Sequence, residues 1–343
     1  MLALTGKVSV FGFRAVANLF RRPFETVQIR PELAEVEPRS PPLVIASGFA
    51  LGGVLTLPPL AQYVVFGNGE MMNKHYGSIS LFILFLGTSV YAANLKLETT
   101  EAWDAYLAEA KAAMQARLQP GAHFLWIDEE PERRDHVRRK GPLILRTRDH
   151  IPQSVPSGLI HDWLGAGFVP NATIADILKV VRDYDHYAHV YKPGVIDSRL
   201  LENEGIKDLF FLRFVNKSVV AKTALDCEGE ATYIQIDEHR WYGYSIINHI
   251  REVARFGTLE QHTLPEGEGL GLIWRLASIT RLEEADGGVY AELEALALSR
   301  DIPAAFRFFV TPIVRRVSRD SLATSLHQTK VAIDVEKGAR KAN

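Results

Sequence analysis

The stretch GLIWRLASITRLEEADGGVYAELEALALSRDIP, residues 271–303, alternates apolar and polar side chains on both sides of a short turn. Such alternation is typical of half-buried β-strands, because successive side chains of a strand point to opposite faces. Asp286 and Gly287 form the Asp-Gly dipeptide that suits a two-residue hairpin turn. The stretch therefore predicts a β-hairpin with strands at about 271–283 and 288–299.

Pairing the two strands across this turn predicts which side chains share a face. Arg281 falls opposite Glu292 and Ile279 opposite Glu294, so one face is mixed and charged and also carries Arg275. The other face is apolar and pairs Trp274, Leu276, Ser278, Thr280 and Leu282 with Ser299, Ala297, Ala295, Leu293 and Ala291.

The apolar face of the hairpin is expected to lie under a helix, because the next segment, 303–317, has a helical pattern. Many side chains on this face are small, and a close-packed interior would need bulkier groups there. Two explanations are open at this point. Either a ligand cavity lies between sheet and helix, or Phe306, Phe309 and Ile313 fill the space.

The segments before and after the hairpin complete a recognisable order of elements. We expect a strand at 157–170 and a helix at 173–191 that bends near Tyr184 and Asp185. Ser318 is a good N-cap residue, which predicts a helix ending at 317 and a second one at 319–335. Between these helical regions we expect further strands at 195–203, 207–216, 219–227, 230–237 and 241–252.

This order resembles the START-like (SRPBCC, polyketide cyclase/lipid transfer) domains. The resemblance lies in VPNATIADILKVVRDYDHYAHVYKPGVIDSRLLENEG (169–205), in the hairpin and in RDSLATSLHQTKVAI (319–333). It implies an α+β helix-grip fold, an antiparallel sheet wrapped on a long C-terminal helix. It also implies a cavity for lipids, sterols, quinones or aromatic polyketides, in domains of which some catalyse cyclisation and many only bind.

With this resemblance the cavity becomes the favoured explanation for the small side chains. The cavity lining predicted from the sequence consists of Trp274, Leu276, Ser278, Thr280, Leu293, Ala295, Ala297, Phe306, Phe309 and Ile313.

The N-terminal part, residues 1–70, contains an uncharged stretch at 42–67 that is a candidate membrane helix, although Pro58 and Pro59 interrupt it. FRAVANLFRRPFETVQI and RSPPLVIASGFALGGVLTL resemble the start of Mla-type (MlaE) lipid ABC-transporter permeases, over about residues 10–60. The remaining membrane helices of that family are missing. This part is therefore interpreted as a truncated permease-like segment that cannot transport by itself.

Residues 71–93, within MMNKHYGSISLFILFLGTSVYAANLK, have the anatomy of a signal peptide with cleavage after Ala92 or Ala93. The alternative is a second membrane helix. A signal peptide would export the remainder to the periplasm, whereas two spans would return it to the cytoplasmic face of the inner membrane. The signal peptide is favoured, because the apolar core from Ile79 to Val90 is short for a span.

Residues 94–150 are expected to be a mixed lead-in, with a helix at 99–118 and short strands at 121–128 and 142–148. The charged run between those strands, at 129–141, is expected to be an exposed loop. The ligand-binding domain then covers 151–336, and 337–343 is a tail.

Composition excludes some functions and leaves few candidates for chemistry. A net charge of -2 argues against a nucleic-acid binder, and the single cysteine allows neither an internal disulfide nor a cysteine-based zinc site. The residues at the helix bend that could hold a metal are Asp183, Asp185, His186 and His189. Capping and turn roles are favoured for them, because such residues usually have these roles at a bend. Candidate acids or bases are His161, Asp162, His239, His249 and His262. Neither a cofactor nor a catalytic residue is assigned.

Three functions remain open. The first is binding, and transfer, of a lipid or other hydrophobic ligand at the inner membrane or in the periplasm. The second is catalysis of a cyclase or aromatase type in the same cavity. The third is a membrane-tethered accessory subunit that docks on Mla-type transporter components.

Overall fold

The computed structural model describes residues 94–148, 151–217, 222–302 and 304–342. The permease-like segment, its candidate span and the signal-peptide segment all lie outside the described residues. Within the described part, no helix combines the length and the apolar composition needed to cross a membrane.

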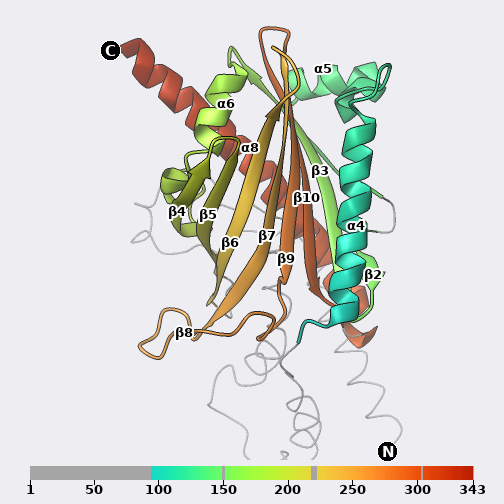
Figure 1. The fold of residues 1–343 in the computed structure, drawn as a ribbon, viewed down its shortest axis with the longest axis vertical. Helices are drawn as coiled ribbons and strands as arrows, with labels where there is room; N and C mark the ends of the chain where they lie inside the picture. Colours follow the sequence, from blue (N-terminus) through green and yellow to red (C-terminus); the bar gives the residue numbers. More distant parts are fainter. Residues whose placement is uncertain (1–93, 149–150, 218–221, 303, 343) are drawn as a thin grey trace, which may run out of the picture. The chain divides into compact units, whose positions relative to one another are not determined.

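A ten-stranded antiparallel sheet forms the body of the domain (Figure 1). Two short strands lie off its main path, because β2 (Gln153–Val155) pairs with β3 and β8 (His262–Thr263) pairs with β7. The main path runs in the order β1 (Leu143–Arg146), β3 (Gly158–Pro170), β10 (Gly288–Arg300), β9 (Arg275–Ala285), β7 (Arg240–Ala254), β6 (Lys222–Gln235), β5 (Lys207–Lys217) and β4 (Val195–Glu204).

The hairpin of β9 and β10 has the predicted register. Arg281 pairs with Glu292 and Ile279 with Glu294. Asp286 and Gly287 have φ angles of 54° and 75°, the positive values that a tight two-residue turn of this kind requires.

Strand β6 is one strand, where the sequence predicted two, at 219–227 and 230–237. Its pairing with β7 shifts between Glu228, opposite His249, and Glu230, opposite Ile246, so the extra residue of a β-bulge lies in β7, opposite Gly229. A Cβ atom at Gly229 would lie 2.8 Å from the backbone oxygen of Ile246, so only glycine fits this close approach. The glycine therefore lies inside a continuous strand, where β7 approaches closely, and does not end it.

Helix α8 (Ala304–Ala342) lies across the concave face of the sheet, which is the predicted helix-grip arrangement (Figure 1). The predicted break at Ser318 is wrong, because the helix is continuous there and Ser318 is fully buried. Packing decides this, since the small side chain of Ser318 fits in the buried interior within a continuous helix. The helix also continues through 337–342, which the sequence assigned to a tail.

The predicted bent helix is present as α6 (Ile174–Val181), a 3-10 turn (Tyr184–His186) and α7 (Tyr187–Val190). Thr173 caps α6 by a reciprocal capping box, in which its hydroxyl accepts from the backbone N–H of Asp176. These short helices flank the β4–β5 side of the sheet.

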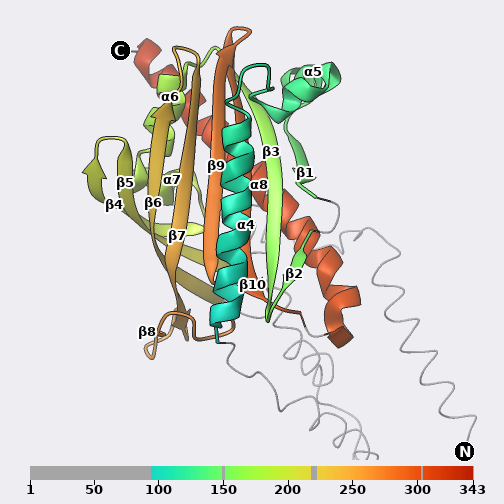
Figure 2. The same cartoon turned by 45° about the vertical axis from the view of Figure 1, so that its right-hand side comes forward.

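Helix α4 (Leu97–Ala116) covers the opposite, convex face of the sheet (Figure 2). The predicted strand at 121–128 is wrong. Phe124, Leu125 and Ile127 are buried in the cluster beneath α4 without pairing to a strand, and a 3-10 turn occupies Trp126–Glu129.

The charged run at 129–141 is also not a loop, because it contains helix α5 (Pro131–Arg139). Pro131 stands in the first turn, where its missing N–H costs no hydrogen bond. Arg134 then pairs with Asp128 at 2.8 Å and lies over the ring of Tyr290 at 4.4 Å. These contacts hold α5 against the sheet.

Candidate ligand-binding cavity

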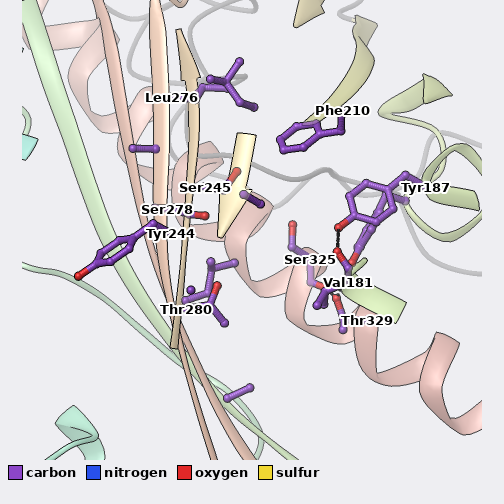
Figure 3. Close-up of a pocket in the computed structure, with 18 of the residues that line it drawn as sticks. Val181, Tyr187, Phe210, Tyr244, Ser245, Leu276, Ser278, Thr280, Ser325 and Thr329 are labelled. Carbon is purple, nitrogen blue, oxygen red and sulfur yellow. Dashed lines mark hydrogen bonds between the residues drawn. The ribbon is translucent and has the colours of Figure 1, made fainter. Parts of the chain in front are cut away.

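A cavity of about 180 Å³ lies between the concave face of the sheet and helix α8, beside the α6–α7 segment (Figure 3). A buried water needs about 10–15 Å³, so the space holds on the order of ten water-sized groups. Voids of this size are not part of ordinary core packing, which leaves few gaps larger than a single water.

The floor of the cavity is a row of small side chains that crosses four strands. Ala231 of β6 pairs with Ser245 of β7, Ser245 with Ser278 of β9, and Ser278 with Ala295 of β10. All four line the cavity. Since directly paired residues point to the same face, these short side chains together leave the room that α8 does not fill.

Helix α8 approaches the sheet closely beside this floor. Trp163, Ala295 and Leu322 form one buried cluster. A Cβ atom at Gly165 would lie 3.0 Å from Cγ of Leu322 and 2.9 Å from Cδ1 of Leu326. Helix α8 therefore packs directly on β3. The cavity lies where the helix crosses above the floor formed by β6, β7, β9 and β10.

The structure places five of the ten predicted residues on the cavity wall, namely Leu276, Ser278, Thr280, Leu293 and Ala295. Ala297 does not line the cavity and is fully buried in the adjacent core cluster with Leu276. The side chains of Phe306, Phe309 and Ile313 lie outside the described residues.

Trp274 occupies a different place from the predicted one. It belongs to the buried cluster under α4, with Trp103 and Leu298, and does not line the cavity. The physical reason is that strand β9 begins at Arg275, so the alternation of faces cannot be extended back to residue 274. The backbone N–H of Trp274 still donates to the carbonyl oxygen of Leu298, at 2.8 Å.

An aromatic wall, which the sequence did not assign to the cavity, closes the side toward α6 and α7. Tyr184 stacks on Phe210 with ring centroids 4.6 Å apart. The hydroxyls of Tyr184 and Tyr233 are hydrogen-bonded at 3.0 Å, and Tyr187 donates to the carbonyl oxygen of Val181 at 2.5 Å. The alternation Phe210, Leu212, Phe214 in β5 was a signal for this wall, because all three share one face.

Burial keeps the tyrosines of this wall protonated. It raises the pKa of Tyr191 and of Tyr233 to about 12, because the charged phenolate would lose its hydration. The pKa of Tyr184 and that of Tyr187 are raised by the same cause. These hydroxyls are hydrogen-bonding groups and not acids or bases near neutral pH.

Glu292 contributes to the cavity boundary, but its carboxylate points to the other face of the sheet. There it accepts from Nε of Arg281 at 2.8 Å and from the backbone N–H of Ile127 at 3.0 Å. Arg281 is 2% exposed and also contacts Glu294 at 3.3 Å, so the predicted charged face of the hairpin is buried beneath α4. Among the described lining residues, none directs a charged group into the cavity.

The candidate acids and bases lie away from the cavity. His161 is buried beside Ser299, with Nε2 and Oγ 3.0 Å apart, and burial lowers its pKa to about 4. Asp162 faces α4 and accepts from the hydroxyl of Tyr106 at 2.8 Å. The remaining three, His239, His249 and His262, are exposed.

The residues at the helix bend have local partners. Nδ1 of His186 lies 2.7 Å from a carboxylate oxygen of Asp183, and Asp185 accepts from the backbone N–H of Leu200 at 2.9 Å. Across the described ranges, no group of three or more His, Cys, Asp or Glu side chains is arranged to hold a metal ion.

No family model matches the chain, and no curated protein sequence matches it. Solved structures do match. A STAR-related lipid transfer protein from Xanthomonas axonopodis is 16% identical, with a TM-score of 0.33, over 55% of this chain and 98% of that chain. Human STARD10 is 6% identical, with a TM-score of 0.38, over 66% and 87%. The Zhui aromatase/cyclase from a Streptomyces species is 11% identical, with a TM-score of 0.34, over 51% and 94%.

Proposed function

We propose that the protein binds a hydrophobic or amphipathic small molecule, lipids included, between the sheet and helix α8. The observation that carries this proposal is the cavity of about 180 Å³ with its floor of small side chains. A mostly apolar pocket with a few polar groups is the usual form of a small-molecule site. Its binding energy would come from removing apolar surface of the ligand from water.

The character of the lining favours binding over catalysis of a cyclase or aromatase type. General acid–base catalysis needs a group whose pKa lies near the working pH and that reaches the substrate. The described lining offers tyrosines with raised pKa values, and a glutamate whose carboxylate is bound to Arg281 on the far side. His161 and Asp162, the buried candidates, do not line the cavity.

We also propose that the protein transfers its ligand between membranes and that it lies at the inner membrane or in the periplasm. There it would cooperate with Mla-type transporter components. Their support comes from the sequence of residues 1–93, and intact-mass measurement of the native protein tests whether those residues are retained. Loss of residues 1–92 or 1–93 together with periplasmic recovery would support export. Retention in the membrane fraction would support the tethered form.

The substitution Ala295→Trp tests the cavity directly. An indole at this position projects from the floor into the space under α8, so the variant should fold but lose the ligand. Binding is measured by titrating the purified 343-residue chain with 2-naphthol, and by mass spectrometry of organic extracts of the protein. Ala113→Trp, at an exposed position of α4, is the matched control and should bind as wild type does.

Two results would contradict the proposal. If Ala295→Trp binds the probe as tightly as wild type, the ligand does not occupy this space. If the variant loses about 1–3 kcal/mol of stability and wild type binds no probe, the space is part of a packed core that the indole overfills.

A further inference from the structure

We propose that the cavity selects an uncharged ligand that carries a buried hydroxyl or carbonyl group. The group would be recognised by a hydroxyl belt, which we define as Ser245, Ser278, Thr280 and Ser325. The inference rests on the proposed function and makes it more specific, because it names the ligand class as a neutral amphiphile that carries an alcohol or a ketone group.

Three members of the hydroxyl belt lie on neighbouring strands of the cavity floor. Ser245 and Ser278 are directly paired across β7 and β9, and Thr280 follows on the same face of β9. None of the three side chains makes a hydrogen bond to another described residue. Figure 3 shows Ser245, Ser278 and Thr280 along the strands that face α8.

The fourth member, Ser325, stands on α8 across the cavity. It is 4% exposed, and its Oγ has no hydrogen-bond partner among the described residues. Figure 3 shows its side chain rising from the helix toward the strands. A buried hydroxyl without a partner is unfavourable, and buried polar groups in native proteins are nearly always satisfied by protein, water or ligand. Ser325 therefore points to a ligand group that completes its hydrogen bonding.

The other hydroxyls around the cavity already have partners, which distinguishes them from the belt. Tyr184 and Tyr233 bond to each other, and Tyr187 donates to Val181. Tyr191 and Thr329 are hydrogen-bonded at 2.9 Å. The free hydroxyls thus gather in one zone, while the satisfied ones form the aromatic wall.

The absence of charge in the described lining decides the class of the polar group. A carboxylate or phosphate placed in the belt would lose its hydration without gaining a cation, which is strongly unfavourable. Arg281, a buried cation of strand β9, lies on the other face of the sheet and is held by Glu292 and Glu294. Hydroxyl groups both donate and accept, so they satisfy an alcohol or a ketone equally well.

A matched series of two-ring probes tests on the 343-residue chain whether the ligand's polar group is neutral or charged. Naphthalene carries no polar group, 2-naphthol carries a neutral one, and 2-naphthoate is anionic. Wild type should bind 2-naphthol at least about tenfold more tightly than 2-naphthoate, because the anion has no counter-charge in the cavity. Equal affinity for 2-naphthol and 2-naphthoate would overturn the assignment of a neutral ligand.

Substitutions in the belt then test its members one at a time. Ser325→Ala and Ser278→Ala should each weaken 2-naphthol binding about 3- to 10-fold, the usual effect of one hydrogen bond, and change naphthalene binding less than about twofold. Thr324→Ala is the control, because the Thr324 hydroxyl donates to the carbonyl oxygen of Asp320 on the outer side of α8. An equal loss of both probes would contradict the belt.

The thermal stability of ligand-free Ser325→Ala adds an independent readout. Removing an unpartnered buried hydroxyl should leave Tm unchanged or raise it. A clear fall in Tm would show that the hydroxyl bonds to its own helix backbone, as serines in helices sometimes do, and would overturn its role in the belt. If no probe binds, or if Ala295→Trp displaces none of them, the proposed function itself fails, a result distinct from failure of the belt.

Discussion

Replacing Asp162 by asparagine should make the protein more stable at pH 8, because the change removes a charge that is buried. Asp162 lies on β3 beneath α4 and is 2% exposed. Its Oδ2 accepts from Tyr106, whereas Oδ1 has no partner among the described residues. Burial, and then the nearby carboxylate of Glu294, raise the pKa of Asp162 to about 7. An amide of the same shape keeps the Tyr106 contact without the cost of a buried charge.

The magnitude follows from the difference between the folded and unfolded pKa values, about 7 against 3.8. Between these pH values the folded state binds a proton that the unfolded state has lost. The free energy of unfolding therefore falls as pH rises, by up to about 1.4 kcal/mol per pH unit. Over about three units the sum is on the order of 4 kcal/mol, which is the upper limit of the gain expected for Asp162→Asn at pH 8.

The neighbouring His161 has the opposite effect on the pH dependence. Its pKa is lowered from 6.5 to about 4, so the unfolded state binds the extra proton and stability rises with pH over that range. In wild type the contributions of His161 and Asp162 nearly cancel between about pH 4 and 6.5. In Asp162→Asn the aspartate no longer offsets the histidine contribution, so the stability of the variant relative to wild type should rise with pH through this range.

Urea unfolding of the 343-residue chain between pH 4.5 and 8, followed by tryptophan fluorescence, measures both effects. Asp104→Asn, at an exposed position on α4, is the matched control for the loss of a carboxylate. The reasoning is refuted if Asp162→Asn is less stable than wild type at pH 8 and its pH profile runs parallel to that of wild type.

Two further variants test how helices α8 and α4 are held on the sheet. Gly165→Val should lower the free energy of unfolding by about 1–3 kcal/mol, because the valine side chain would displace Leu322 and Leu326 of α8. If urea unfolding gives the same stability as wild type, that close approach is disproved. Arg281→Met should cost about 3–5 kcal/mol, because Glu292, which is fully buried, would keep its charge without the cation that balances it. The double variant Arg281→Met with Glu292→Gln should recover most of this loss. If the same unfolding assay shows no recovery, lost packing and not the unpaired charge causes the destabilisation.

The local features of the hairpin were predictable from the sequence because they depend on neighbours along the chain. The Asp286-Gly287 dipeptide selects a turn, the turn determines the register, and the register brings Arg281 opposite Glu292. The same alternation placed Ser278 and Ala295 on the face toward α8, where they line the cavity.

The errors occurred where contacts distant in sequence outweigh a local signal. Ser318 has the chemistry of an N-cap, yet it is buried within α8 because the helix must remain continuous across the sheet. Trp274 has the right parity for the cavity, yet it precedes β9 and packs under α4. No local pattern shows that α4 covers the convex face, so the burial of the charged side of the hairpin was not predicted.

By itself, the sequence determined the hairpin, its register and the helix-grip order of elements, because alternation and turn chemistry act between residues a few positions apart. Only the tertiary structure decided which buried face is filled and which is hollow. Beneath α4 the space is packed by Trp103, Met114 and the Arg281 ion pairs. Beneath α8, small side chains from four strands align across the sheet. That alignment depends on the pairing of segments that together extend from Ala231 to Ala295, and it leaves Ser325 facing a cavity and not a packed core.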